Sequence, residues 1–293
     1  MKPRDIALAV AIAAAWGVNF VIIDVGLGHF PPLLFNALRF TLAAFPAVLL
    51  AGRPPAAWRW VIAVALALSV TKFSLLFVGM HAGMPAGLAS LVLQSQAVFT
   101  IGLAALLLRE RPGRRQLAGL AVAAAGIGVV ATRVGAGGLP AGAFASVLGA
   151  AAAWGLANIA TRRAAPTDVL RFMIWVSAVA SVPLILLSLL VEGPAADLAA
   201  LRAIDGPAVA ALLYVVLVAT LAGFGGWGLL IRRYGASPVA PFSLLVPVFG
   251  LASAALFLGE RIHRTDLLGG VLVIGGVLVG VAPVVRPLDR VAA

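Results

Sequence analysis

Two basic side chains lie inside long apolar stretches of the chain. Arg39 lies within residues 31–51 and Lys72 within residues 60–80, and no acidic residue lies equally deep. A cation in a hydrocarbon environment costs on the order of a few kcal/mol unless it faces a cavity or a partner. We therefore expect one or both cations to neutralise an anionic group of a bound solute, such as a carboxylate. The alternative is structural: Arg39 pairs with Asp24, and Lys72 extends to an interface.

Tryptophan and asparagine recur together at two places. Trp16 precedes Asn19 by three residues, so both lie on one face of a helix. Trp154 precedes Asn158 by four residues and also shares a face with it. An aromatic ring beside an amide suits an amphipathic solute, and we predict that both pairs line a solute path. The alternative is that the tryptophans fill space between helices rich in alanine and glycine.

Uncharged polar side chains in two other apolar stretches are further candidates. Gln94 and Gln96, in residues 86–108, point about 200° apart in an α-helix. We therefore expect only one of them, Gln94, to line a path, and the other to bond a neighbouring helix. Ser243 lies four residues before Pro247, which leaves the Ser243 carbonyl without its usual donor and favours a kink. Such a kink could act as a gate, or it could only determine the shape of the helix.

The composition places the chain in a membrane. It is 63% hydrophobic and 11% charged, and a soluble protein of this length could not cover itself with so little charge. The absence of cysteine excludes disulfides, thiolate metal sites and cysteine nucleophiles. No apolar stretch holds paired carboxylates, a His–acid pair or a set of metal ligands, so we expect neither an enzyme nor a bound cofactor or metal.

Ten apolar stretches are long enough to span a bilayer, which takes about 20 residues each. They are residues 6–26, 31–51, 60–80, 86–108, 116–134, 142–161, 170–191, 208–231, 238–258 and 266–284. The longest break between them, 192–207, carries several charges and is expected to hold a short surface helix. The predicted fold class is an all-α integral membrane protein with ten transmembrane helices.

The two halves of the chain repeat one another. Markers that close the first half recur 150 residues later: Glu110 as Glu260, Gly119 as Gly269 and Gly126 as Gly276. The Trp-Gly pair that opens each half recurs 138 residues later, at Trp154. Five spans per half is an odd number, so the halves must enter the membrane in opposite directions. We predict two five-helix inverted repeats, residues 1–138 and 139–293, with a solute path between them.

The basic residues are unequally distributed between the two sides of the predicted membrane. Fifteen of the 21 Lys and Arg residues fall on the side of the N-terminus, four on the other side and two inside spans. This asymmetry predicts that both termini are cytoplasmic, in a multi-pass protein of a bacterial inner membrane. It also accounts for the net charge of +11, so the lipid bilayer and a small-molecule substrate, and no nucleic acid, are the expected partners.

Four motifs carry a resemblance to a known family: Trp16-Gly17, Asn36-Ala37-Leu38-Arg39-Phe40, Pro247-Val248-Phe249, and Gly259-Glu260-Arg261 followed by Gly269. With them the whole chain resembles the EamA type of the drug/metabolite transporter superfamily, and within it the aromatic amino acid exporters. The resemblance implies a ten-span inner-membrane permease with five-plus-five inverted repeats that exports small metabolites. The first half departs from the pattern, since Arg109 stands where the second half has Gly259.

We therefore expect a permease that exports small organic solutes, aromatic or other apolar amino acids, by alternating access through a central cavity between the repeats. Aromatic rings of the protein would contact the side chain of the substrate, and a cation of the protein would bind the substrate carboxylate. One alternative is a carrier of sugar phosphates, which would show several convergent cations. Two further alternatives are a carrier of drug-like compounds and a structural membrane protein. Proton-driven transporters commonly carry a buried carboxylate. Only the shallow Asp24 qualifies here, so we expect facilitated movement down a gradient.

Overall fold

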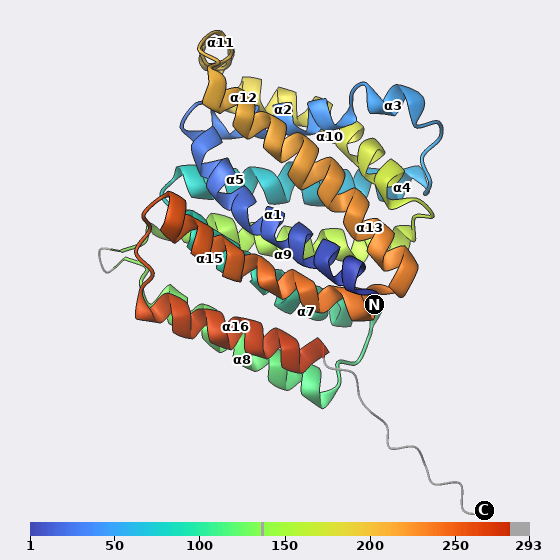
Figure 1. Ribbon diagram of the computed structural model, residues 1–293, viewed down its shortest axis with the longest axis vertical. Helices are drawn as coiled ribbons and strands as arrows, with labels where there is room; N and C mark the ends of the chain where they lie inside the picture. The colour runs from blue at the N-terminus through green and yellow to red at the C-terminus, as the bar shows by residue number, and fades with distance from the viewer. Residues whose placement is uncertain (136–137, 282–293) are drawn as a thin grey trace, which may run out of the picture.

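The structure is a computed structural model that describes residues 1–135 and 138–281. Its described part consists of helices (Figure 1). The first half contains α1 (Pro3–Leu27), α2 (Pro32–Ala44), α3 (Ala47–Leu50), α4 (Trp58–Val64), η1 (Ala65–Lys72), α5 (Phe73–His81), α6 (Ala86–Val92), η2 (Leu93–Ser95), α7 (Gln96–Leu108) and α8 (Arg114–Ala131). The second contains α9 (Ala141–Ala164), α10 (Val169–Val191), α11 (Pro194–Arg202), α12 (Gly206–Leu213), η3 (Tyr214–Ala222), α13 (Gly223–Tyr234), α14 (Ala236–Val239), η4 (Ala240–Leu245), α15 (Val246–Phe257) and α16 (Arg264–Val281).

Nine helical runs in the described residues are long and apolar enough to cross a membrane. They coincide with the first nine predicted spans, which confirms the all-helical membrane fold. The tenth predicted span corresponds to α16, and its last residues, 282–284, lie outside the described part. The short surface helix expected between 192 and 207 is α11, which begins at Pro194.

The two sides of the molecule differ in charge. The N-terminus and the connections α7–α8 and α9–α10 lie at the right-hand edge of Figure 1. We call this edge the basic side, because those connections carry the arginines of 109–115 and 162–163. The opposite edge, where α15 is joined to α16, is called the far side.

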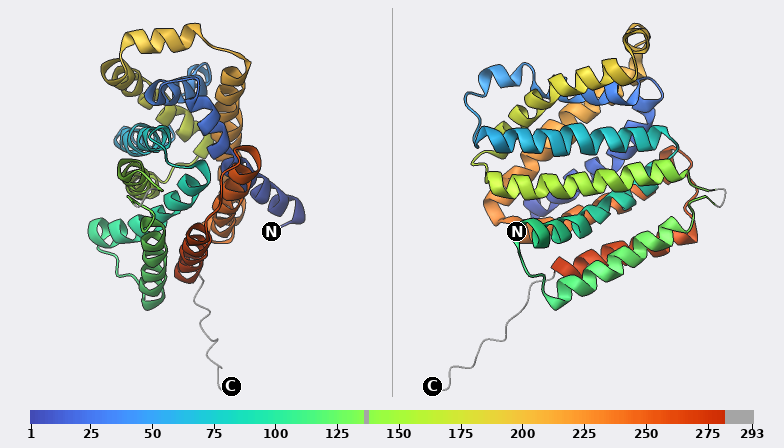
Figure 2. Two further views of the ribbon diagram at one scale, coloured as in Figure 1. Left: turned by 90° about the vertical axis from the view of Figure 1, so that its left-hand side faces the viewer. Right: turned by 180° about the vertical axis from the view of Figure 1, so that it is seen from behind.

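The last helices of the two halves pack against each other along their glycines. Figure 2 shows α8 and α16 side by side at one edge of the bundle. A Cβ on Gly119 would overlap Gly276, and a Cβ on Gly126 would lie 2.8 Å from the Gly269 carbonyl. Contacts in this order require antiparallel helices. Because Gly269 and Gly276 are the repeats of Gly119 and Gly126, the pair is symmetric, and the opposite orientation of the two halves is confirmed.

A second symmetric contact joins the halves at the centre. A Cβ on Gly17 of α1 would lie 2.8 Å from the backbone nitrogen of Gly250 in α15. A Cβ on Gly155 of α9 would lie 3.1 Å from the nitrogen of Thr100 in α7. The first helix of each half therefore crosses the fourth span of the other half at the same place. This close approach explains why glycine follows tryptophan in both opening motifs.

Each half also contains a π-helical segment at the same position. η1 ends at Lys72 and η3 ends 150 residues later, at Ala222. The altered hydrogen bonding makes one carbonyl in each available to a neighbouring helix. The Ser69 carbonyl accepts from Nδ2 of Asn36 at 3.0 Å. The Ala219 carbonyl, its repeat equivalent, accepts from Nε1 of Trp16 at 2.9 Å.

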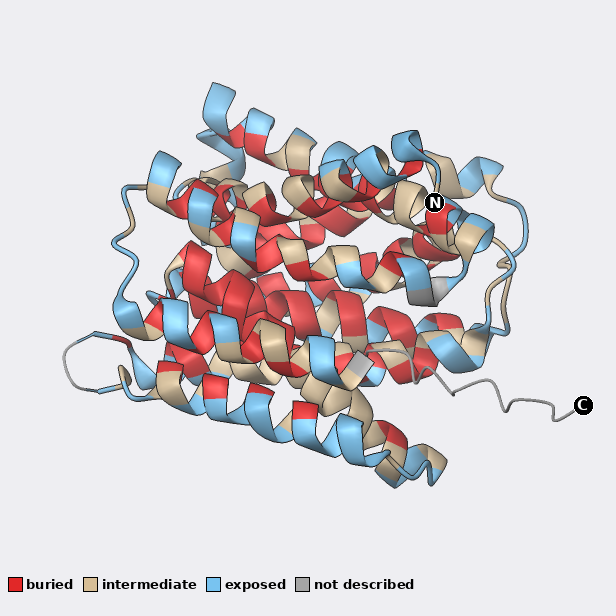
Figure 3. Cartoon of the chain, turned by 60° about the horizontal axis from the view of Figure 1, so that its bottom comes forward, coloured by how far each residue is buried: buried red, intermediate tan, exposed pale blue. Residues whose placement is uncertain are grey.

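The buried residues lie along the middle of the helical bundle, and the outer faces are exposed (Figure 3). Many of the exposed residues are large and apolar, such as Leu106, Leu190 and Val271. Surfaces of this kind are stable in contact with lipid, as the composition predicts.

Candidate functional site

A cavity of about 660 Å³ lies between the two halves in the part of the molecule nearer the basic side. Its wall comes from the middle and end of the Ala86–Leu108 run, the end of α9, the start of the Ala240–Phe257 run and the end of α16. The polar residues that line it are Gln94, Gln96, Thr100, Asn158 and Ser243. The apolar ones are Ala97, Ile101, Pro238, Ala240, Pro241, Leu244, Val277 and Leu278. No Lys, Arg, Asp or Glu of the described residues belongs to this lining.

Both glutamines line the cavity, contrary to the expectation that only one of them would. The reason is local backbone geometry. Gln94 lies in η2, a short 3₁₀ turn, and Gln96 begins α7. A 3₁₀ helix has three residues per turn, so residues two apart are separated by about 120° instead of about 160°. Both side chains therefore reach one wide cavity.

Amides and a hydroxyl form a connected cluster in this cavity. Asn158 donates from Nδ2 to Oε1 of Gln96 at 2.7 Å and to Oγ1 of Thr100 at 3.1 Å. These bonds leave Oδ1 of Asn158 and Nε2 of Gln96 without a hydrogen-bond partner among the described residues. Oδ1 of Asn158 is a hydrogen-bond acceptor, and Nε2 of Gln96 carries two N–H donors. The cluster can therefore bind an ammonium group and a carboxylate of one solute.

The second amide, Gln94, joins the opposite wall of the cavity. Its Nε2 lies 3.5 Å from the carbonyl oxygen of Ser243. Ser243 lies in η4, a 3₁₀ segment, and its carbonyl accepts from the backbone N–H of Val246. The predicted loss of a backbone donor is therefore wrong, because the 3₁₀ geometry uses Val246 in place of Pro247, and Gln94 adds a bond from another helix.

Lys72 lies deeper than this cavity and does not line it. Its side chain is buried, and its Nζ lies 3.2 Å from the ring centroid of Phe73 and 4.7 Å from that of Trp154. Within the described residues it forms no ion pair. The aromatic faces partly compensate the buried charge. Trp154 lies one helical turn from Asn158 on α9, so Lys72 contacts the same helix that carries the amide cluster.

Among the described residues Arg39 forms no ion pair with Asp24, so this structural alternative is not borne out. Its Nε donates to Oγ1 of Thr220 at 3.0 Å, and its guanidinium lies 4.1 Å from the centroid of the Phe73 ring. Nη1 has no partner in the described part of the chain. An aromatic face and a hydroxyl, instead of a carboxylate, hold this cation between the halves.

Trp16 and Asn19 do not reach the cavity. Trp16 bonds the Ala219 carbonyl and packs against Trp227, with ring centroids 5.1 Å apart. Asn19 is buried, and its Oδ1 has no partner among the described residues. The structure thus brings Gln94, Asn158 and Ser243 together from the predicted set, and places Trp16, Asn19, Arg39, Lys72 and Trp154 outside the lining of this cavity.

Gln96 and Thr100 line the cavity but were not among the predicted site residues. The available signal was their spacing. Residues four apart share one face of a helix, and Oγ1 of Thr100 bonds the Gln96 carbonyl at 2.7 Å. Asn158 of α9 joins the same face, since α7 and α9 cross at Gly155.

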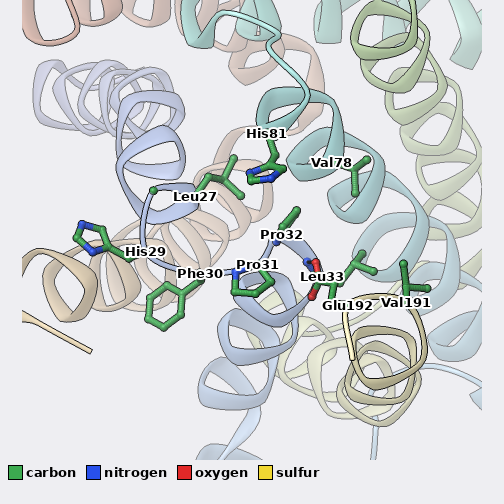
Figure 4. A pocket seen from close by; sticks show the side chains of 11 residues that line it. Leu27, His29, Phe30, Pro31, Pro32, Leu33, Val78, His81, Val191 and Glu192 are labelled. Atoms are coloured by element: carbon green, nitrogen blue, oxygen red, sulfur yellow. Dashed lines mark hydrogen bonds between the residues drawn. The ribbon is translucent and has the colours of Figure 1, made fainter. Parts of the chain in front are cut away.

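A second cavity, of about 510 Å³, lies at the far side (Figure 4). It is bordered by the α1–α2 connection and the ends of α5 and α10. The Glu192 carboxylate in its wall accepts from the backbone nitrogens of Leu33 and Leu34, at 2.7 and 2.9 Å. His29 pairs with Asp205. Glu192, His29 and Asp205 therefore have partners within the protein, and none of the predicted site residues lies here.

Nearly the whole sequence matches a known family. The profile of the EamA-like transporter family matches residues 4–132 and 142–281. A probable amino-acid metabolite efflux pump of Salmonella typhimurium is 41% identical over 286 residues, 96% of each chain. A probable terminal-alkyne amino-acid exporter of Streptantibioticus cattleyicolor is 31% identical over 92% of this chain and 90% of that one. One crystal structure, 17% identical, has a TM-score of 0.65 over 95% of this chain and 96% of its own, which supports the fold.

Proposed function

The chain belongs to the EamA-like transporter family, and on that premise we propose that it exports aromatic and other apolar amino acids from the cytoplasm. It is a multi-pass membrane transporter, not an enzyme. Relatives named as amino-acid exporters support the substrate class. The observation that carries the proposal is the uncharged cavity in which an amide cluster adjoins an apolar wall.

The chemistry of the cavity fits a zwitterion with a neutral side chain. Free amide groups of Asn158 and Gln96 are placed to accept from an ammonium group and to donate to a carboxylate. Ile101, Leu244 and Val277 offer apolar surface for the side chain. The volume falls within the range of about 300–1,000 Å³ usual for small-molecule sites. A sugar phosphate needs several convergent cations, and the lining described here contains none.

Lys72 would act at a later stage of the same path. A carboxylate that moves past the ring of Trp154 meets a buried ammonium group whose present neighbours are aromatic faces. An anion is the partner that best offsets the cost of this charge. We assign Lys72 and Trp154 to the deep part of the substrate path, and Arg39, Trp16 and Asn19 to the packing around it.

The orientation follows from charge. Fifteen basic residues lie on the predicted side of the termini, among them Arg286 and Arg290, which are outside the described residues. We propose that the basic side is cytoplasmic, in a bacterial inner membrane. The cavity then lies on the side from which an exporter takes its solute, and the two halves, residues 1–138 and 139–293, move relative to each other to release it.

The test is a flux measurement with purified protein in liposomes, without an imposed pH gradient. Leucine and phenylalanine are expected to show saturable uptake, and aspartate and lysine are not. Saturable flux under these conditions supports facilitated transport. Flux that requires a pH gradient overturns that part of the proposal, and no amino-acid flux in either condition overturns the substrate class.

Replacing Lys72 by methionine is expected to lower the maximal leucine flux about tenfold or more, because the carboxylate loses its partner in the deep part of the path. Lys72→Arg keeps the charge and is the matched control, expected to retain part of the flux. Parent-like flux in Lys72→Met would remove Lys72 from the transport path.

A further inference from the structure

We propose that Glu260 and Glu110 are gating residues that close opposite sides of the path in turn, and that this structure is the conformation open to the basic side. The proposal rests on the transporter family and holds for any substrate. It follows from comparing the two halves at positions that the repeat makes equivalent.

On the far side, Glu260 fastens the start of one helical run to the end of another. Its carboxylate accepts from the backbone nitrogens of Ala86 at 2.6 Å and Gly87 at 3.1 Å. These residues begin the Ala86–Leu108 run, and Glu260 follows α15. Charge-assisted bonds of this kind are among the stronger ones in proteins. We call these two hydrogen bonds the far-side gate contact.

Close packing surrounds the far-side gate contact. A Cβ on Gly87 would lie 3.1 Å from the Ala254 side chain and 3.2 Å from Cα of Leu251. One turn deeper, a Cβ on Gly250 would lie 2.6 Å from Cβ of Ser90. Ser90 itself is buried. No solute can pass between α6 and α15 while these atoms are in contact.

On the basic side, the equivalent residues are apart. Ala240 and Leu244 are the repeat equivalents of Ser90 and Gln94, and both line the 660 Å³ cavity. Thr100, the equivalent of Gly250, lines its other wall. Helices that touch on the far side are thus separated by the cavity on the basic side. A pseudo-symmetric protein whose equivalent helices touch on one side and are apart on the other is in one of its two end states.

Glu110, the repeat equivalent of Glu260, is placed differently. It is about half exposed and paired with Arg162 on the surface of the basic side. The positions equivalent to Ala86 and Gly87 are residues 236 and 237, at the start of α14. When the halves exchange conformations, the symmetry gives Glu110 the backbone N–H groups of 236 and 237 as partners. Glu260 is then released.

The far-side gate contact is suited to release because burial of the ionised Glu260 carboxylate is itself unfavourable. Burial raises the pKa of Glu260, the two backbone N–H groups lower it, and the nearby Asp24 and Asp266 raise it further. These effects oppose one another. The two hydrogen bonds offset the unfavourable desolvation of the buried Glu260 carboxylate. Loss of these bonds therefore shifts the conformational equilibrium toward the state in which the far side is open.

The test uses a single cysteine as reporter, since the chain has none of its own. Ser90→Cys is introduced, and its reaction with a hydrophilic maleimide is followed in nanodiscs, where both sides are accessible. In the parent background the reaction is expected to be slow. Glu260→Gln should accelerate it about tenfold, as expected for loss of a charge-assisted bond. Glu192→Gln is the matched control, because Glu192 makes the same pair of bonds to α2, away from the gate.

The reciprocal variant completes the test. Glu110→Gln removes the partner that stabilises the other end state, so Ser90→Cys should react more slowly than in the parent. If Glu260→Gln does not fold, Glu260→Asp, shorter by one methylene, should accelerate labelling in the same direction. Unchanged labelling in a folded Glu260 variant, or equal acceleration by Glu192→Gln, would overturn the proposal. Because no substrate is added, this result is independent of the amino-acid assignment.

Discussion

Asn158→Leu is expected to reduce amino-acid flux at least about tenfold while the protein remains folded. Asn158 donates to both Gln96 and Thr100, and leucine has a similar size but no polar atom. The substitution removes the free acceptor Oδ1 and leaves Oε1 of Gln96 with only the long contact to Oγ1 of Thr100, at 3.4 Å. A buried polar group left unpaired costs about 1–3 kcal/mol, and a loss of 1.4 kcal/mol in solute binding is a factor of ten.

A double-mutant cycle distinguishes a binding cluster from a packing defect. Gln96→Leu removes the other half of the same amide pair, and the two residues act as a unit. The double variant is therefore expected to lose little more flux than either single variant. The measurement is leucine uptake in liposomes together with the melting temperature of each variant. Parent-like flux in a folded Asn158→Leu protein would exclude the amide cluster from substrate binding.

Gly276→Leu is expected to destabilise the protein by about 1–3 kcal/mol or more, because overpacking forces helices apart. A Cβ at Gly276 would lie 2.5 Å from the backbone nitrogen of Ala123 and 2.5 Å from the Gly119 carbonyl. Both neighbours are backbone atoms and cannot rotate away. In membranes, small residues let helix backbones approach closely, and the resulting van der Waals packing helps to drive helix association.

The neighbouring glycine gives a control one residue away. A Cβ at Gly275 would meet nothing within 4 Å, so Gly275→Leu adds a side chain facing open space or lipid. The measurement is unfolding by heat or by denaturing detergent for the two variants and the parent. Equal stability of Gly276→Leu and Gly275→Leu would show that α8 and α16 do not depend on this contact.

The overall architecture could be predicted from the sequence because each feature that defines it is visible in a local stretch of the chain. Apolar length defines each span, and the recurring Gly119 and Gly126 mark the repeat. An odd number of spans then fixes the inverted orientation. The same glycines form the α8–α16 contact, so one sequence pattern indicates both the repeat and the packing of the two repeats against each other.

The site was less predictable because it depends on departures from regular helix geometry. The 3₁₀ turn at Leu93–Ser95 allows Gln94 and Gln96 to line one cavity, which the uniform rotation per residue of an α-helix disfavours. Arg39 bonds Thr220 in the other half of the chain. The sequence indicates that a buried cation needs compensation, but it does not indicate that aromatic faces, which carry no charge, supply it to both Arg39 and Lys72.

Entry of amino acids into the cavity between α7 and η4 can be measured directly. Ala97 belongs to its lining, and the chain has no native cysteine, so Ala97→Cys reports on this cavity alone. The measurement is the rate of its modification by a hydrophilic maleimide in nanodiscs, with and without saturating leucine or phenylalanine. Protection by these two, and none by aspartate or lysine, is the predicted result. An unchanged rate with leucine and phenylalanine would contradict the assignment of the cavity as the amino-acid site.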